Sequence, residues 1–468
     1  MDMIIQYTDT FLSSIFDKSL KNITDIDELA SDIENDCKTL ALNILQEIIQ
    51  QMNINLRQDK ETRKERGLVI KEKDRPRKLL TPLGSLEFNR DYYYNVKEEK
   101  YEAPLDSMIG IQPRERIGGT VAARLVTMAT EVSYAKSSEI VTGGYVSRQT
   151  VKNQIAKAPH LEKEPGKEAQ KVKVLDIFAD EDHVHMQKPN KQRGKKNIMV
   201  PLVTVSEGIE QVSNRRGKTV NPMHFVDENF DSNALWKSVE GYIAKAYDIT
   251  QIESIRIHAD GGRWIKTGLE DFTNVDHILD EFHLKQRLRD IDRRFRGNNL
   301  RRNLERAIRE ENYTQIETVL GNMYSKCNSE ADAKAISETL TFLGSHWDAI
   351  TNRYKEGMTG SCTEGQVSHL LSERFSRNPM GWSEAGLGKL SSLRIYRKNG
   401  GEISGRHFKN GFESAVTYRS YAEEIVRKEL KNYDFSWMTE LKEHYIMDTS
   451  SATQKAVRNL GKMHWSIS

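Results

Sequence analysis

The sequence has little that would mark a secreted, zinc-binding or membrane protein. Its three cysteines, Cys37, Cys327 and Cys362, are odd in number and widely spaced, which fits neither a disulfide framework nor a zinc site. The longest nearly continuous apolar run, residues 198–205, is far shorter than the roughly 20 residues that a membrane helix needs. The first residues also lack the basic and apolar segments of a signal peptide. We therefore expect a cytoplasmic protein with reduced cysteines and no membrane partner.

The sequence also lacks an excess of either charge. Its 70 lysines and arginines are nearly balanced by 68 aspartates and glutamates, so the net charge is only +2 over 468 residues. Overall charge therefore indicates no partner, and any surface that binds nucleic acid must be local. At about 150 residues per domain, the length predicts roughly three domains.

Two segments nevertheless concentrate basic side chains. Residues 57–78 carry ten basic and five acidic side chains, a pattern that fits either a solvated linker or a segment that contacts phosphates. Residues 283–309 carry ten basic and three acidic side chains, and most of the basic ones are arginines, which bind phosphate through paired hydrogen bonds. A solvated helix face is the alternative for the second segment. We favour DNA binding there, through Arg293, Arg294 and Arg301.

Hydrophobic periodicity predicts helices around a mixed sheet. Apolar residues three and four apart predict an amphipathic helix over 31–52, which would pack in this chain's own core or against a second copy. Residues 79–88 predict a hairpin with a Pro-x-Gly turn. Further strands are expected at 173–179, 198–205, 219–226, 254–259 and 275–279, and further helices at 115–157, 232–248, 283–347, 363–377 and 411–444. This order predicts an α/β domain accompanied by helical regions.

The end of the 115–157 stretch has the layout of a helix-turn-helix. A short helix over 134–141 is followed by Gly143-Gly144 and by a second helix that Ser147 would cap. Side chains at the start of the second helix would then face the major groove, because their types suit base edges and phosphates. These residues are Arg148, Gln149 and Lys152. A plain helical hairpin, without DNA binding, is the alternative.

Two predicted strands lead into carboxylates. Asp180 follows the strand 173–179, and Asp260 follows the strand 254–259 just before two glycines. A carboxylate at the end of a buried strand is partly desolvated, and two of them side by side repel unless a divalent cation lies between them. The alternative is that Asp260 only caps the next helix. We favour a metal site that uses the pair.

A site for two metal ions usually has a third carboxylate, and Glu364 is the candidate. It lies in the first turn of the predicted helix over 363–377, where a glutamate is also a common favourable contact with the helix dipole. Spacing alone does not single this residue out.

These residues, taken in order, resemble the ISLre-type bacterial insertion-sequence transposases of the Mutator-like DDE superfamily. The motifs are Asp180-Glu181-Asp182-His183-Val184, His258-Ala259-Asp260-Gly261, Asp280-Glu281-Phe282-His283-Leu284, Thr363-Glu364-Gly365-Gln366-Val367-Ser368 and Asn378-Pro379-Met380-Gly381-Trp382-Ser383. The resemblance also includes Thr81-Pro82-Leu83-Gly84 and Ala103-Pro104-Leu105-Asp106, so it extends over most of the chain.

The resemblance implies an RNase H-like catalytic domain with a mixed sheet, interrupted by a helical insertion and preceded by a helical DNA-binding region. It implies Asp180, Asp260 and Glu364 as the catalytic residues and as ligands of Mg²⁺, for which Mn²⁺ can substitute. The auxiliary residues are Asp280 and His283, which match an Asp-x-x-His signature, Asp182, which is an alternative to Asp180, and Trp382. Trp382 is a candidate for stacking on an unpaired base, with core packing as the alternative.

The corresponding division of the chain has six parts. They are an N-terminal helical region (1–66), a hairpin and helix-turn-helix-like DNA-binding region with a linker (67–170), the first part of the RNase H-like core (171–290), the helical insertion (291–355), the last part of the core (356–400) and a C-terminal helical region (401–468).

The expected function is that of a DNA transposase, which binds terminal inverted repeats and target DNA and catalyses strand cleavage and strand transfer. We expect a homo-oligomer when the protein is assembled on DNA, and a location at the nucleoid. One alternative is a domesticated transposase that acts as a DNA-binding regulator without catalysis. Another is a host nuclease such as a junction resolvase.

Overall fold

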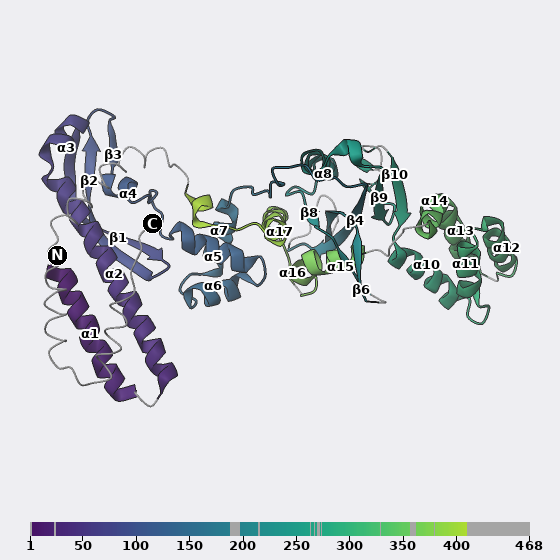
Figure 1. Cartoon of the computed structure of the whole chain (residues 1–468), viewed down its shortest axis with the longest axis horizontal. Helices are drawn as coiled ribbons and strands as arrows, with labels where there is room; N and C mark the ends of the chain where they lie inside the picture. Colours follow the sequence, from purple (N-terminus) through teal and green to yellow (C-terminus); the bar gives the residue numbers. More distant parts are fainter. Residues whose placement is uncertain are drawn as a thin grey trace. The chain divides into compact units, whose positions relative to one another are not determined.

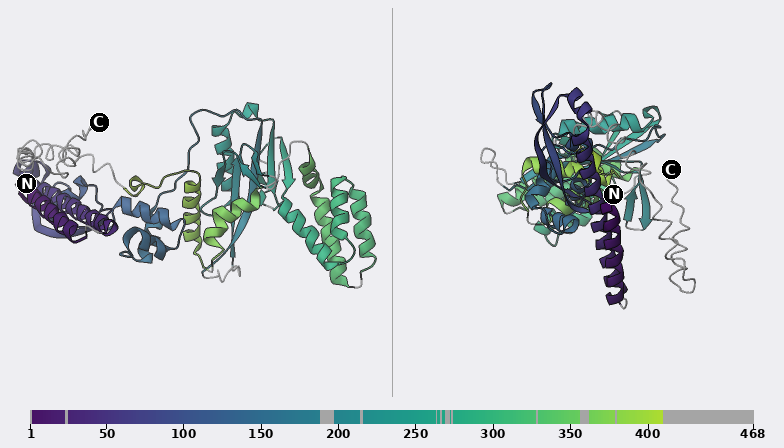
Figure 2. Two further views of the ribbon diagram at one scale, coloured as in Figure 1. Left: turned by 60° about the horizontal axis from the view of Figure 1, so that its bottom comes forward. Right: turned by 90° about the vertical axis from the view of Figure 1, so that its left-hand side faces the viewer.

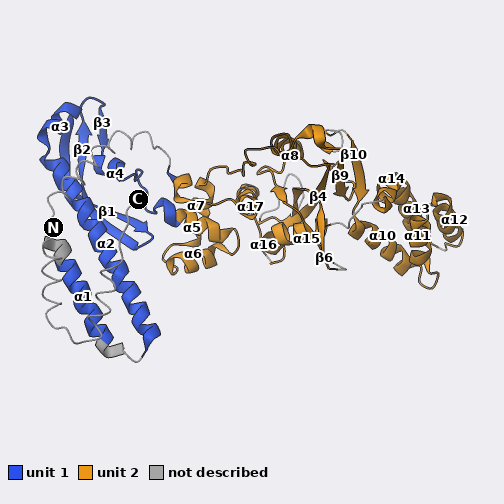
Figure 3. Cartoon of the chain, viewed as in Figure 1, with its two compact units in different colours: residues 1–121, 409–468 blue, residues 122–408 orange. Residues whose placement is uncertain are grey.

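The computed structural model describes residues 2–22, 25–187, 197–213, 216–262, 264–265, 267–268, 272, 274–327, 329–355, 362–378 and 380–409. The chain divides into two compact units, which Figure 3 distinguishes by colour: residues 1–121 with 409–468, and residues 122–408. The helices expected over 411–444, and nearly all of the predicted region 401–468, lie outside the described residues. No helix among the described residues is long and apolar enough to cross a membrane.

Unit 1 combines helices with a small antiparallel sheet. Its elements are α1 (Asp2–Asn22), α2 (Ile26–Gln58), α3 (Lys60–Arg66), β1 (Leu68–Thr81), β2 (Gly84–Asn95), β3 (Lys100–Glu102) and α4 (Pro104–Met108). The helix expected over 31–52 lies within α2, which the Asp25 side chain caps. Ile49, Met52 and Leu56 of α2 pack with Leu79 of β1 and Phe88 of β2 in one buried cluster. The later part of α2 therefore packs in the chain's own core.

The basic segment 57–78 is not a linker. Its residues form the end of α2, all of α3 and most of β1, and the predicted hairpin is therefore much longer than its turn suggested. Arg57 explains part of this order, because its Nε and Nη2 donate to both oxygens of the buried Asp91 carboxylate, each at 2.7 Å. A paired side chain of this kind is fixed by tertiary contacts that charge composition does not reveal.

Unit 2 contains the predicted helix, glycine turn and helix. The elements are α5 (Gly119–Ala129), which begins at the boundary between the units, α6 (Tyr134–Thr142) and α7 (Arg148–Lys157). Gly143 ends α6 in the left-handed conformation, at φ +60°, and Gly144 also has a positive φ. The Ser147 side chain accepts from the Thr150 N–H at 3.2 Å, as expected for an N-cap.

The centre of unit 2 is a five-stranded mixed sheet. Its strands are β4 (Val174–His185), β5 (Asn197–Ser206), β8 (Met223–Phe225), β9 (Ser254–Ala259) and β10 (Val275–Leu279), and β6 (Ile209–Ser213) pairs with β7 (Arg216–Thr219) in a separate hairpin. The order is β10-β9-β4-β5-β8, with β4, β9 and β10 parallel and β5 antiparallel to both of its neighbours. The mixed α/β architecture expected from the sequence is therefore present.

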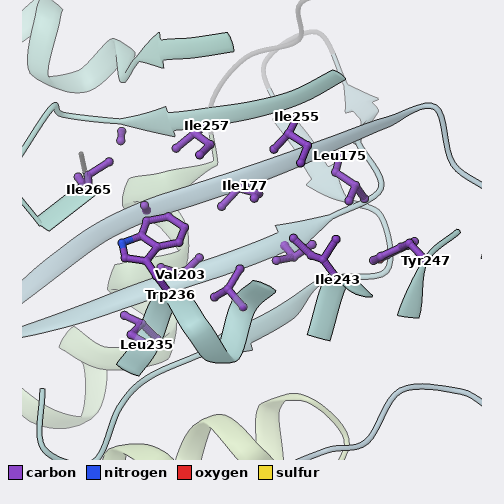
Figure 4. Packing of buried hydrophobic residues seen from close by; sticks show 14 of the residues in the cluster. Leu175, Ile177, Val203, Leu235, Trp236, Ile243, Tyr247, Ile255, Ile257 and Ile265 are labelled. Atoms are coloured by element: carbon purple, nitrogen blue, oxygen red, sulfur yellow. The ribbon is translucent and has the colours of Figure 1, made fainter. Parts of the chain in front are cut away.

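One face of this sheet packs against α8 (Ser232–Ala246), as Figure 4 shows. Leu175 and Ile177 of β4 and Ile257 of β9 meet Trp236 and Ile243 of α8 in a buried cluster. Because side chains alternate along a strand, the residues between these positions point to the opposite face. The apolar side chains at positions 175, 177 and 179 of β4 therefore face α8, and the side chains at the even-numbered positions point away from it.

The long helical stretch predicted after residue 283 is present beyond β10 (Figures 1 and 2). It comprises α10 (Glu281–Arg294), α11 (Leu300–Arg309), α12 (Tyr313–Tyr324), α13 (Glu330–Ser345) and α14 (Trp347–Thr351). These helices bury a hydrophobic cluster of their own, which includes Leu288, Leu304, Leu320 and Leu343. They therefore have a core that does not depend on the α8 side of the sheet.

The chain then returns to the sheet. It forms α15 (Thr363–Val367), a π-helical turn η3 (Ser368–Ser372), α16 (Glu373–Phe375) and α17 (Glu384–Lys398), and both α15 and η3 contact β4. The buried Arg394 of α17 donates to the carbonyl oxygens of His369 and Leu370 in the π turn and to that of Thr130 after α5. Arg394 therefore joins the end of α5 to the helical segment that carries Glu364.

Candidate active site

Three aspartates lie at the same level of adjacent parallel strands, Asp180 within β4 and the other two directly after β9 and β10. Ala179 of β4 and Leu279 of β10 both pair with Ala259 of β9, so the next residues are Asp180, Asp260 and Asp280. The ladder continues past Ala259, whose carbonyl accepts from the Asp280 N–H at 2.9 Å. In-register residues of parallel strands point to the same face. We call this set the acid row, with Asp260 in the middle.

The acid row points away from the core around α8. Asp180 has the opposite parity to Ile177 and Ala179, which are buried in that core, and it is only 7% exposed. Burial raises the pKa of Asp180 to about 7, and the negative charges of Glu181, Asp260 and Asp280 add to the effect. The Glu181 N–H opposes the shift by donating to Asp180 Oδ1 at 2.8 Å. The row is therefore a crowded, partly desolvated set of carboxylates.

Local backbone contacts hold the other two aspartates. The Gly262 N–H donates to Asp260 Oδ1 at 2.8 Å, and the Phe282 N–H donates to Asp280 Oδ1 at 2.8 Å. Asp280 thereby caps α10. The same residue is the outermost member of the acid row and the start of the helical region. Asp260 makes a tight turn rather than the helix cap considered as an alternative.

The structure corrects the expected position of Asp180 relative to its strand. The expectation was a strand that ends at Ala179, whereas β4 continues through Asp180 and Asp182 to His185. It is the pairing with β9 that ends at Ala179. Asp180 and Asp182 share a face of β4, so side-chain direction does not choose between them. Their neighbours differ. Burial raises the pKa of Asp182, and the hydroxyls of Ser376 and Ser372 oppose this shift by hydrogen bonding to its carboxylate.

Glu364 is placed on the correct segment but not in the acid row. It lies in α15, which packs against β4, and its side chain is exposed. Within the described part of the chain, no three His, Cys, Asp or Glu side chains converge closely enough to hold a metal ion. The donor chemistry fits Mg²⁺, whereas a closed set of three ligands is not formed.

A second polar layer lies beneath the acid row, and sequence reasoning missed it. His258 Nε2 is 2.8 Å from Asp176 Oδ1, both side chains are buried, and the ring of Phe178 stacks on the imidazole with centroids 4.7 Å apart. The only sequence signal for this pair is its even-numbered spacing from Asp180 and Asp260. Such spacing shows a shared face but not a contact between two strands.

Two further contacts border Asp260 and were also not anticipated. A Cβ atom at Gly261, which has φ +88°, would lie 2.5 Å from Nε2 of His346, so this residue at the end of α13 packs directly on the glycine backbone. Trp264, two residues after Gly262, donates through Nε1 to Glu181 Oε2 at 2.8 Å. Gly261 is therefore required both by its backbone conformation and by the close approach of the helical region.

The helix-turn-helix residues lie as expected for a surface that could bind DNA. Arg148, Gln149 and Lys152 are exposed on α7, while Val151 and Ile155 face inward. Gln149 Nε2 donates to Asn153 Oδ1 at 3.0 Å, which joins two polar side chains on the exposed side.

The other predicted residues have mixed surroundings. Arg293, Arg294 and Arg301 are each within 4 Å of a carboxylate, of Asp290, Asp332 and Glu305 respectively. Ion pairs near the surface contribute little to stability. His283 is partly buried in the first turn of α10.

Trp382 is buried, as the core-packing alternative predicts, and its ring is not available to stack on a base. It is 7% exposed, donates through Nε1 to the Phe375 carbonyl at 3.0 Å and packs against Tyr134 and Phe375. Arg374 lies over the same ring, 5.0 Å from its centroid. The indole is therefore a packing residue between α6 and the segment after η3.

Comparison with known proteins adds the family. The model of a family described as "Uncharacterised protein family (UPF0236)" matches residues 19–410. The chain belongs to this family. A UPF0236 protein of Caldanaerobacter subterraneus subsp. tengcongensis is 32% identical over 436 residues, which cover 92% of this chain and 90% of the relative. A UPF0236 protein of Streptococcus gallolyticus is 23% identical and covers 73% of this chain and 76% of its own length.

One solved structure is also similar in part. The "Drosophila P element transposase strand transfer complex" aligns with 63% of this chain and 84% of its own chain, at 9% identity and a TM-score of 0.20. An overlap at this level is too weak to bear on the fold or the activity of the present chain.

Proposed function

We propose that this UPF0236 member is the DNA transposase of an insertion sequence, with an RNase H-like catalytic domain in unit 2. The observation that carries the proposal is the acid row. Burial and like charge raise the pKa of Asp180 to about 7, so the row is unfavourable without a cation and is stabilised when a divalent cation binds. All three of its aspartates lie in motifs that resemble ISLre-type transposases.

Asp180 and Asp260 would hold Mg²⁺, with Mn²⁺ as a substitute. A bound ion at such a site would polarise a phosphodiester and supply an activated water. The chain itself orients the ligands, since the Gly262 N–H fixes Asp260 and the Phe282 N–H fixes Asp280. The third ligand is Glu364 according to the family resemblance and Asp280 according to the strand register. These assignments are distinguishable by substitution.

Recognition of the element's ends is assigned to α7, whose exposed side carries Arg148, Gln149 and Lys152. Arg293, Arg294 and Arg301 in α10 and α11 follow Asp280 directly and would contact phosphates beside the acid row. Joining two element ends requires two active sites, so the assembly on chromosomal DNA in the cytoplasm would contain at least two copies. The name of the Caldanaerobacter relative joins eleven locus designations, and repeated copies in one genome are what transposition produces.

The test is cleavage of labelled duplexes that carry the inverted repeats flanking the reading frame, in Mg²⁺ or Mn²⁺. We expect nicking at the repeat end by the wild type, loss of nicking in Asp260→Asn, and unchanged repeat binding by that variant. Asp276→Asn is the matched control, because Asp276 lies on β10 at the opposite end of the strand from Asp280 and binds Lys355. Nicking by Asp260→Asn at the wild-type rate would refute the assignment of the site.

The second candidate is a DNA-binding regulator that has lost catalysis. It is favoured by one observation, namely that no closed set of three metal ligands exists among the described residues. The same experiment separates the two functions, because a regulator would bind the repeats without metal-dependent nicking. Cleavage of branched DNA without regard to sequence would instead indicate a host nuclease.

A further inference from the structure

The outer face of the small sheet in unit 1 carries tyrosines interleaved with cations. The rings of Tyr92 and Tyr101 stack with centroids 5.8 Å apart and an interplanar angle of 5°, and Tyr94 lies 5.0 Å from Tyr101. Lys71 Nζ lies 5.6 Å from the centroid of Tyr94, and the Arg75 guanidinium carbon lies 5.0 Å from that of Tyr92. We call these five residues the tyrosine face.

Over residues 91–95 of β2, buried and partly exposed side chains alternate, and the partly exposed ones are turned outward. Asp91, Tyr93 and Asn95 are buried, whereas the intervening Tyr92 and Tyr94 are partly exposed. Tyr101 is 59% exposed, although it stacks on a neighbouring ring. Tyrosines are enriched at interfaces, and a group of them at the surface commonly marks a binding surface.

The charges on the face restrict the kind of partner. Lys71 and Arg75 are exposed on β1 and stand directly over tyrosine rings. Arg75 also pairs with Glu72 at 3.5 Å, but both side chains are about half exposed, so the pair is weak. Cations beside open aromatic rings fit a ligand that combines flat π-systems with negative charges at short, regular spacing.

We propose that the tyrosine face binds single-stranded DNA. Unpaired bases stack on the rings, foremost on Tyr101, while Lys71 and Arg75 contact the phosphates between them. In a duplex the base faces are already stacked on each other, so a flat tyrosine surface has no base plane to contact there. The choice of DNA over RNA rests on the proposed function, whereas the geometry of the face does not depend on the acid row.

The test uses the full-length protein and a fluorescein-labelled oligothymidylate of 15 nucleotides, with binding measured by fluorescence anisotropy. We expect Tyr101→Leu to raise the Kd at least about fivefold and Tyr101→Phe to leave it nearly unchanged, because stacking needs a ring but not a hydroxyl. Tyr324→Ala is the matched control, since Tyr324 is similarly exposed on α12 and belongs to no proposed site. Substitution at an exposed position also preserves the core, which thermal unfolding of each variant would verify.

A second readout locates the contact directly. Ultraviolet crosslinking of an oligothymidylate that contains 5-iododeoxyuridine, followed by peptide mapping, should place the adduct on Tyr92, Tyr94 or Tyr101. An unchanged Kd in Tyr101→Leu, adducts confined to other segments, or binding of oligouridylate but not of oligothymidylate would overturn the proposal. Asp260→Asn should bind the oligothymidylate normally, so failure of repeat cleavage and failure of this inference are separate results.

Discussion

Asp280 lies in register with Asp260, and the Asp280 N–H donates to the carbonyl of the residue that precedes Asp260. The two carboxylates therefore follow neighbouring parallel strands at one level, and Asp180 lies at the same level within β4, on the other side of Asp260. Because Asp280 is also the N-cap of α10, the beginning of the helical region and the edge of the acid row are built by one residue.

The first prediction concerns the third metal ligand. If Asp280 is the third ligand, as the strand register indicates, Asp280→Asn should weaken binding of Mn²⁺ at least about tenfold. Glu364→Gln should then change the affinity for Mn²⁺ little. Isothermal calorimetry of the DNA-free protein measures both affinities without relying on catalysis. The reverse order of effects would show that α15 moves to bring Glu364 to the site and would favour the assignment made from the family resemblance.

The second prediction concerns the cost of the acid row in metal-free protein. The pKa of Asp180 is raised to about 7 in the folded state, against about 4 when unfolded. The folded protein therefore binds the proton more tightly, and the free energy of unfolding should fall as pH rises from about 4 to about 7. Asp180→Asn should remove this part of the pH dependence and stabilise the protein at pH 8 by about 1–3 kcal/mol.

Urea unfolding in EDTA at pH 5 and pH 8, with wild type and Asp180→Asn side by side, measures this difference. The wild type should regain stability when Mg²⁺ is added, whereas Asp180→Asn should regain little. Equal pH dependence in the two proteins would mean that Asp180 titrates normally in the folded state.

The third prediction concerns the layer beneath the acid row. His258→Ala leaves the Asp176 carboxylate, which is 3% exposed, without its partner at 2.8 Å. Removing one member of a buried pair costs about 3–5 kcal/mol, so this variant should be strongly destabilised. Replacing both residues together, as Asp176→Leu with His258→Phe, should cost less than His258→Ala alone. Chemical unfolding of the wild type, His258→Ala and the double variant measures this. A double variant that is less stable than His258→Ala would contradict the prediction.

The fourth prediction concerns acid stability and lies away from the acid row. Burial lowers the pKa of His224 to about 4, and its Nδ1 is 2.8 Å from Thr204 Oγ1. The unfolded chain takes up this proton near pH 6.5, so the contribution of neutral His224 to stability should be lost as pH falls from about 6.5 to about 4. His224→Asn should therefore show a smaller loss of stability over this range.

His160 is the internal comparison for that experiment. Although burial opposes it, the carboxylates of Glu162 and Glu228 raise the pKa of His160. The contribution of protonated His160 to folding stability is therefore complete below the pKa that this residue has in the unfolded chain, and it is lost as pH rises through the pKa in the folded protein. This pH dependence is opposite in direction to that of His224. Thermal unfolding between pH 4 and 8 should separate His160→Asn from His224→Asn by the direction of the change.

Much of the local structure follows from the sequence alone. The period of apolar residues predicted the strands at 173–179, 198–205, 254–259 and 275–279 and the long helical stretch from 283. Ser147 and the Gly143-Gly144 pair predicted the turn between α6 and α7. These features depend on neighbours within one turn of a helix or on alternation along one strand, and both are visible in the order of residues.

The tertiary structure decided the relations between distant segments. It placed Asp280 beside Asp260, extended β4 through Asp182, made an ordered helix and strand of residues 57–78, and buried Trp382 under Arg374 and Tyr134. Strand register and packing depend on contacts between residues that are far apart in the chain. A local sequence pattern is compatible with several registers and several packing arrangements. The sequence by itself thus determined which carboxylates are available, and only the pairing of β4, β9 and β10 decided which of them lie together.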